Sequence, residues 1–184
     1  MKTFHNIASA ESFATGTLGI KTAKLGSDLA LAQHVIAGLI HCKSLGAQLP
    51  PIVRIKTLDD GVIALLVPFA KPVLEINQGE AIFFSSARKF IAEGFVKSGP
   101  YPVILHEIGH YQHFRALGGC DPYLKVTRGR FDASNRKIAR SVSFNASTDP
   151  CEFVAETFCG LSTGKKYSAA VLSLYSKYKG PAPL

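Results

Sequence analysis

The sequence predicts an α+β fold in a single domain of 184 residues. Segments with helical periodicity occupy the beginning and the second half of the chain, and three short apolar runs with turn signals lie between residues 52 and 77. A hydrophobic fraction of 47% and a charged fraction of 18% are typical of a globular protein, and the length is sufficient for a real core. We therefore expect helices packed on one small sheet.

The N-terminal part is predicted to contain one clear helix. Residues 1–24 carry weak signals, which indicates partial flexibility. Ser27 and Asp28 can cap a helix that runs to about Leu45. Its apolar residues stand at near-helical spacing: Leu31, Val35, Leu39 and Cys42.

Three strands are expected next, at residues 52–55, 62–67 and 73–77. The turn signal Asp59-Asp60-Gly61 separates the first two. Together they predict a small three-stranded mixed sheet. A further helix is expected over residues 85–96.

The second half is predicted to be helical. Proline in the first turn and the Gly118-Gly119 stop delimit a helix over residues 103–117. A short helix is expected near residues 134–140. Asp149 is typical of an N-cap and Pro150 of the first helical position, so another helix begins there. The last helix is expected over about 166–179.

The helix over residues 103–117 carries the pentapeptide His106-Glu107-Ile108-Gly109-His110. Residues four apart lie on one helical face, so His106 and His110 can bind one Zn²⁺ at about 2.0–2.1 Å. Glu107 is offset by one position and can take a proton from water that the metal activates. The alternative is a helix with two surface histidines, but apolar residues on both sides of this helix predict burial.

A catalytic zinc usually has three protein ligands. Six residues after His110 the chain has Ala116, which excludes the longer motif with a third histidine. His113 lies about 10 Å along the axis from His106, too far to share the ion in a straight helix. We interpret His113 as a polar residue at the edge of the cleft.

The better candidates are Glu152 and Glu156, which share a face of the helix that begins at Pro150. Two like charges on a mostly apolar helix need a compensating cation. A capping box with Asp149 would explain Glu152 but not Glu156. We favour Glu152 as the third ligand and Glu156 as the partner that holds a ligand histidine by its other N–H. The reverse assignment, with Glu156 on zinc, stays open.

The motifs H-E-I-G-H and E-F-V-A-E-T-F resemble those of gluzincin metallopeptidases. More narrowly, they are similar to the group that includes the catalytic domain of anthrax lethal factor and related phage and polymorphic-toxin peptidases. The resemblance implies a zincin-like fold, with the sheet packed on the H-E-x-x-H helix, a glutamate-ligand helix and a C-terminal helix. It also implies Zn²⁺ as cofactor, Glu152 as third ligand, and residues 73–77 as an edge strand that pairs with an extended peptide substrate.

One position departs from this pattern. The group often has a tyrosine seven residues before the ligand glutamate, where it stabilises the oxyanion, and the matching residue here is Asn145. An amide can donate to an oxyanion, but more weakly than a phenol. Losing such a donor costs roughly 10²–10³ in rate. The resemblance therefore implies zinc binding more firmly than fast catalysis.

Composition limits the setting of the protein. No stretch reaches 18 uninterrupted apolar residues, so we expect no membrane insertion. The N-terminus lacks a basic start followed by an apolar run, which predicts no secretory signal and a cytoplasmic location in the producing cell. Delivery to a target cell or packaging in a virion is compatible with this. Cys42, Cys120, Cys151 and Cys159 form no C-x-x-C pair, and we expect reduced thiols.

The net charge of +8 favours anionic partners. Aromatic residues are not interleaved with the basic cluster at residues 125–140, so nucleic-acid binding rests on charge alone. The leading hypothesis is a zinc-dependent endopeptidase that acts on a protein or peptide. In it Zn²⁺ is held by His106, His110 and Glu152, Glu107 is the general base, and Asn145 assists the oxyanion. The alternative is a zinc module with weak or absent turnover that serves a toxin or phage assembly.

Overall fold

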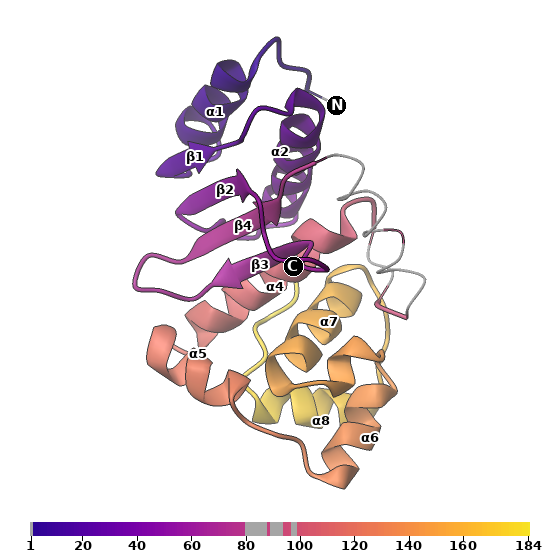
Figure 1. The fold of residues 1–184 in the computed structure, drawn as a ribbon. Coiled ribbons are helices and arrows are strands. Elements are labelled where there is room, and N and C mark those ends of the chain that lie inside the picture. Colours follow the sequence, from indigo (N-terminus) through magenta and orange to yellow (C-terminus); the bar gives the residue numbers. More distant parts are fainter. Residues whose placement is uncertain (1, 80–87, 89–93, 97–98) are drawn as a thin grey trace.

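The structure is a computed structural model, and it describes residues 2–79, 88, 94–96 and 99–184. Within these residues it is an α+β structure of seven α-helices and one four-stranded mixed sheet (Figure 1). The helices are α1 (Ile7–Gly16), α2 (Leu29–Ser44), α4 (Pro102–Ala116), α5 (Cys120–Thr127), α6 (Ala133–Arg140), α7 (Pro150–Ser162) and α8 (Ala169–Lys177). The strands are β1 (Thr22–Lys24), β2 (Ile52–Lys56), β3 (Ala64–Val67) and β4 (Val73–Asn77).

The sheet has the strand order β1-β2-β4-β3, in which β3 alone runs antiparallel to its neighbour. The prediction of three strands was wrong because β1 joins the sheet beside β2, with Thr22 opposite Ile52. The prediction that residues 73–77 form an edge strand was also wrong. All five residues of β4 are buried, and β4 lies between β2 and β3, so the edge strand next to α4 is β3.

The N-terminal segment, for which the sequence gives only weak signals, forms α1 and β1. Asn6 begins α1 with a reciprocal capping box, in which its side chain accepts from Ser9 N and the Ser9 side chain accepts from Asn6 N. The helix predicted from residue 28 to about 45 is confirmed as α2. Asp28 caps it by accepting a hydrogen bond from Leu31 N.

Helix α4 is the centre of the structure and confirms the helix predicted over residues 103–117. It packs against α2, β3 and α7, which explains its apolar residues on both sides. Two glycines permit close contact. A Cβ on Gly38 of α2 would stand 2.8 Å from Ile104 Cγ1, and one on Gly109 would stand 3.2 Å from the Ala155 Cα of α7.

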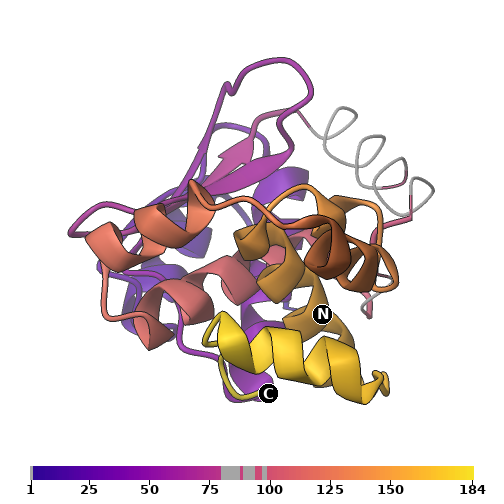
Figure 2. The ribbon, with the colours of Figure 1, turned by 90° about the horizontal axis from the view of Figure 1, so that it is seen from below.

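The helices that follow α4 enclose its remaining side. The helix predicted near residues 134–140 and the helix predicted to begin at Pro150 are confirmed as α6 and α7. Asp149 caps α7 by accepting hydrogen bonds from Cys151 N and Glu152 N. Figure 2 shows α8 on the side of α4 and α7 that faces away from β3. Helix α5 was not predicted, and it packs on both α4 and α7.

The helix expected over residues 85–96 falls largely outside the described residues. In the part of the chain that the structure describes, no helix combines the length and apolar character that crossing a bilayer requires.

Candidate metal centre

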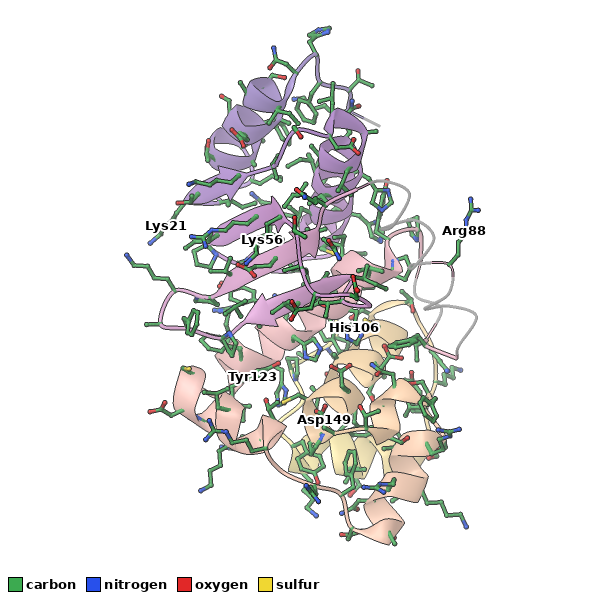
Figure 3. The ribbon with its side chains drawn as sticks, in the orientation of Figure 1. Lys21, Lys56, Arg88, His106, Tyr123 and Asp149 are labelled. Atoms are coloured by element: carbon green, nitrogen blue, oxygen red, sulfur yellow. The ribbon has the colours of Figure 1, made fainter. Side chains whose placement is uncertain are left out.

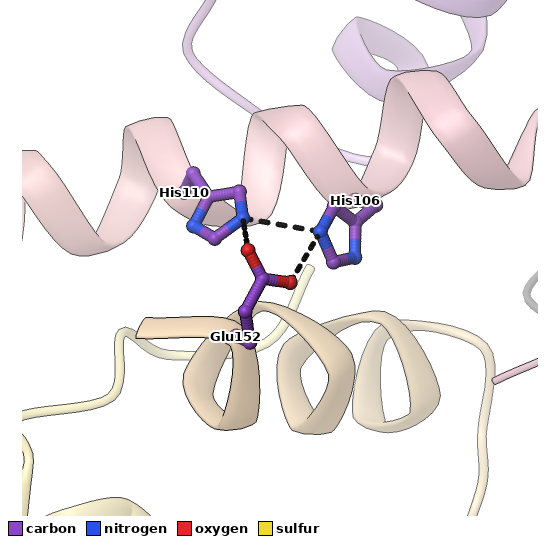
Figure 4. Close-up of side chains that lie close together, drawn as sticks. All are labelled: His106, His110 and Glu152. Atoms are coloured by element: carbon purple, nitrogen blue, oxygen red, sulfur yellow. Dashed lines mark hydrogen bonds and ion pairs between the residues drawn. The ribbon is translucent and has the colours of Figure 1, made fainter. Parts of the chain in front are cut away.

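Two histidines of α4 and one glutamate of α7 converge on one point (Figure 4). His106 Nε2 lies 3.1 Å from Glu152 Oε2, and His110 Nε2 lies 3.2 Å from Glu152 Oε1. The two Nε2 atoms are 3.1 Å apart. The helical spacing predicted from the sequence thus brings both imidazoles to one point, and the Asp149 cap sets the start of the helix that supplies the carboxylate.

This donor set fits a zinc ion. At the usual Zn–N distance of about 2.0–2.1 Å, two corners of a tetrahedron lie about 3.3 Å apart, close to the separations in this cluster. Burial alone would lower the pKa of His106, but Glu152 and Glu156 outweigh it and hold that pKa well above its usual value. Burial would raise the pKa of Glu152, but His110 and His106 hold it well below. The site therefore favours positive charge at its centre.

In each candidate ligand histidine, the second ring nitrogen, Nδ1, has a hydrogen-bond partner of its own. His106 Nδ1 donates to Glu156 Oε1 at 2.7 Å, and the other Glu156 oxygen accepts from Val96 N at 2.8 Å. Both oxygens of Glu156 therefore already accept hydrogen bonds, whereas the oxygens of Glu152 face the Nε2 atoms of both histidines. This geometry favours Glu152 over Glu156 as the ligand.

The partner of His110 is Tyr123 of α5, whose hydroxyl lies 3.0 Å from His110 Nδ1. Sequence reasoning missed Tyr123 because it predicted no helix over the residues of α5. The only signal in the sequence for this contact was an aromatic residue shortly after the histidine motif. When Nδ1–H donates to this hydroxyl oxygen, the Nε2 lone pair of His110 points at the centre.

Glu107, the predicted general base, is 6% exposed and lies between α4 and β3. Burial raises the pKa of its carboxyl group, while the two histidines and a backbone hydrogen bond from Leu66 oppose this rise. Its Oε2 atom is buried and has no hydrogen-bond partner among the described residues. A buried carboxylate oxygen without a partner, next to the donor cluster, is suited to accept a proton from water.

Asn145, the predicted oxyanion donor, begins a short 3₁₀ helix (Asn145–Ser147) just before α7. Its amide Nδ2 donates a hydrogen bond to Glu152 Oε2. The residue thus belongs to the site, and in this structure it orients the carboxylate. Its contact with an oxyanion stays a prediction.

His113 and the four cysteines, which could also bind a metal, lie outside the cluster. His113 was interpreted as a residue at the edge of the cleft, but it is fully buried and its Nε2 lies 2.8 Å from Tyr178 O. It faces α8 because the helix turns it away from Glu152. The four cysteines have free thiols, and none belongs to the donor cluster.

Two hollows flank the cluster. Both are lined by Ala64, Glu107 and Glu152, and together they form a cleft along β3. The His110-side hollow, with a volume of about 260 Å³, lies between β3, α5 and the start of α7. The His106-side hollow, of about 200 Å³, extends toward the start of α4 and Asn145. Figure 3 shows His106, Tyr123 and Asp149 on three separate segments below the sheet.

Comparisons with known protein families, with curated proteins and with solved structures found no significant match. The relationship to gluzincins therefore stays a prediction that rests on the motifs of α4 and α7. The structure adds the convergence of their side chains.

Proposed function

We propose that this protein is a zinc-dependent endopeptidase. The observation that carries the proposal is the convergence of His106, His110 and Glu152 beside the buried, unpartnered oxygen of Glu107. A structural zinc site has four protein ligands, whereas this cluster offers three among the described residues and opens into a cleft. Three ligands with an open side are typical of hydrolytic sites.

In this proposal His106, His110 and Glu152 hold Zn²⁺, which supplies a Lewis acid that polarises the scissile carbonyl and acidifies water. Glu107 takes the proton from the attacking water and delivers it to the leaving amine nitrogen. Glu156 and Tyr123 keep the two imidazoles in one tautomer and orientation.

The edge strand β3 is suited to bind an extended peptide. Ile63 O accepts from Asn77 N on the β4 side, and backbone groups of alternate residues point to opposite sides of a strand. Those of Ala64 and Leu66 therefore face the cleft, and the Leu66 N–H is already directed at Glu107. A substrate that adds to β3 would pass directly over the general base.

The second candidate is a zinc module without efficient turnover. The observation that favours it is Asn145, whose amide is engaged by Glu152 where the resembling peptidases often carry a tyrosine. Such a module would retain the metal and bind a partner in the same cleft.

Metal analysis combined with a peptide digest tests both candidates. The parent protein is expected to hold one zinc per chain and to cleave peptides from a broad library. Glu107→Gln keeps the shape and the metal ligands but removes the base, so we expect full zinc content and a loss of turnover of about 10²–10⁴-fold. Glu75→Gln, which alters a buried carboxylate in β4, is the matched control.

Each outcome decides between the candidates. Zinc without cleavage in the parent favours the binding module. Equal turnover of the parent and Glu107→Gln contradicts the assigned base. Absence of zinc from a protein purified without chelators rejects both candidates.

A further inference from the structure

We infer that the His110-side hollow receives a basic side chain of the substrate, at a position adjacent to the scissile bond. The inference rests on the proposed function and specifies the substrate class. It is carried by three features of the hollow: its charge, its free acceptor and its apolar walls.

The charge of the hollow is negative although the chain is basic. Glu107, Glu152 and Asp149 line it, so a divalent ion leaves one negative charge uncompensated. The chain has 21 lysine and arginine residues, yet none lines either hollow among the described residues. Figure 3 shows Lys21 and Arg88 directed away from the site, on other sides of the molecule.

Most polar groups of the hollow are already satisfied by the protein. The Tyr123 hydroxyl contacts His110 Nδ1 at 3.0 Å, and the Cys151 thiol lies 3.1 Å from Thr127 Oγ1. Asp149 uses Oδ1 for both capping hydrogen bonds. In the described part of the chain its Oδ2 has no hydrogen bond, which leaves a carboxylate oxygen for a ligand.

Glu107 Oε2 is a buried acceptor without a partner in this space, and the proposed mechanism assigns it to water. Asp149 is therefore the group available for a cationic side chain. Its position at the start of α7, three residues before Glu152, sets that side chain beside the reacting centre.

The remaining walls are apolar and come from β3, its following turn and α5: Leu65, Leu66, Pro68 and Leu124. Lysine and arginine bury their methylene stems on such surfaces and extend the charged end to a polar partner. A volume of about 260 Å³ is below that of pockets for drug-sized ligands and suits a single side chain.

The His106-side hollow has a different chemistry. Its walls include Val62, Ile63, Phe95 and Val103, and apart from the shared carboxylates its polar groups are His106 and Asn145. The two sides of the scissile bond are therefore distinguished, with a basic residue on one side and an apolar residue on the other.

The test begins with mass-spectrometric mapping of cleavage sites in a peptide library digested by the zinc-loaded protein. A preferred peptide is then made in two forms, with lysine or with norleucine at the mapped basic position. Norleucine keeps the stem and removes the charge. We expect kcat/KM to favour the lysine peptide by roughly tenfold, since hydrogen bonds to charged groups exceed neutral ones in strength.

Asp149→Asn isolates the acceptor, because asparagine is an equally good N-cap and preserves the start of α7. The lysine-to-norleucine ratio should fall toward one, while zinc content stays that of the parent. Asp132→Asn is the matched control. It removes the same charge from the N-cap of α6, where Asp132 accepts from Asn135 N on the exposed surface. Its ratio should equal that of the parent.

The outcomes separate the inference from the function on which it rests. Cleavage without a basic residue beside the scissile bond, or an unchanged ratio in Asp149→Asn, overturns the inference and leaves the peptidase intact. If no library peptide is cleaved by the zinc-loaded parent, the proposed function fails and the inference fails with it.

Discussion

Gly109 of α4 lies directly against Ala155 of α7. A Cβ on Gly109 would stand 3.2 Å from both the Cα and the carbonyl oxygen of Ala155, and 3.1 Å from a ring carbon of Phe158. The two Ala155 atoms belong to the backbone, so they cannot rotate away as a side chain can. The same two helices carry the candidate ligands His110 and Glu152, so the distance between their backbones also sets the distance between these side chains.

Gly109→Ala should therefore separate the helices. Alanine favours a helix by about 1 kcal/mol over glycine, but overpacking costs about 1–3 kcal/mol. We expect a lower free energy of unfolding and a Kd for zinc raised roughly tenfold, as for other changes that misorient ligands. Urea unfolding and competition with a chromophoric chelator measure the two effects.

Gly38→Ala is the matched control. Its Cβ would meet the Ile104 side chain on the α2 side of α4, away from the metal ligands. It should lower stability without changing the zinc Kd of the folded protein. Equal zinc affinities in Gly109→Ala and the parent would show that the contact with Ala155 does not position the ligands.

Glu156→Gln tests the assignment of the two glutamates. An amide can accept through one atom only, so either the His106 Nδ1–H or the Val96 N–H loses its acceptor. We expect the zinc Kd to rise about 10–100-fold. Glu152→Gln, which changes the ligand, should abolish binding at micromolar zinc.

Isothermal titration calorimetry with zinc on the two glutamine variants provides the comparison. Glu75→Gln is the control, because it alters a buried carboxylate that is not part of the donor cluster. If Glu156→Gln loses zinc as completely as Glu152→Gln, the ligand assignment should be reversed.

Tyr123→Phe removes the oxygen behind His110 and keeps the ring that packs on Phe114. The buried Nδ1–H then lacks an acceptor, and we expect roughly tenfold weaker zinc binding. Competition with a chelator measures it. Tyr175→Phe removes a comparable bond, from a hydroxyl to Pro181 O at 2.7 Å, and should leave zinc binding unchanged. An equal effect of both variants would indicate general destabilisation.

The parts of the site that the sequence predicts are those that depend on local geometry. His106 and His110 share a face because of helical spacing, and Asp149 with Pro150 marks the start of the helix that carries Glu152. Motifs within single helices are therefore sufficient to predict the roles of these residues. Tyr123 was missed because its contact with His110 depends on the turn at Gly118-Gly119 and on the direction in which α5 then runs.

The order of the strands also lies beyond local reasoning. The run Val73–Asn77 contains Glu75 and Asn77, whose polar side chains are typical of an edge. Both are buried in the structure with partners from neighbouring segments. Lys56 Nζ lies 3.2 Å from Glu75 Oε2, and Asn77 Nδ2 donates to Val62 O at 2.8 Å. Strand pairing is a contact between distant segments, and it decides that β3 rather than β4 borders the cleft.

His113 should make stability depend on pH. Its Nε2–H donates to Tyr178 O, and its Nδ1 is buried without a partner in the described residues. Burial lowers its pKa from 6.5 to about 4, although the Tyr178 carbonyl opposes the change. Between these values the unfolded chain binds a proton that the folded protein does not, so stability falls as pH decreases.

The expected contribution of His113 is a loss of about 2 kcal/mol in the free energy of unfolding between pH 6.5 and 4.5. His113→Gln is the control, since its amide can still donate to Tyr178 O but does not titrate. The free energy of unfolding of both proteins is measured with denaturant across this pH range, in the presence of a chelator. The difference between the two curves removes the contribution of the titrating groups that both proteins share. The parent should lose more stability than the variant as the pH falls. Parallel curves would mean that His113 has the same pKa in the folded and unfolded protein, which contradicts the prediction.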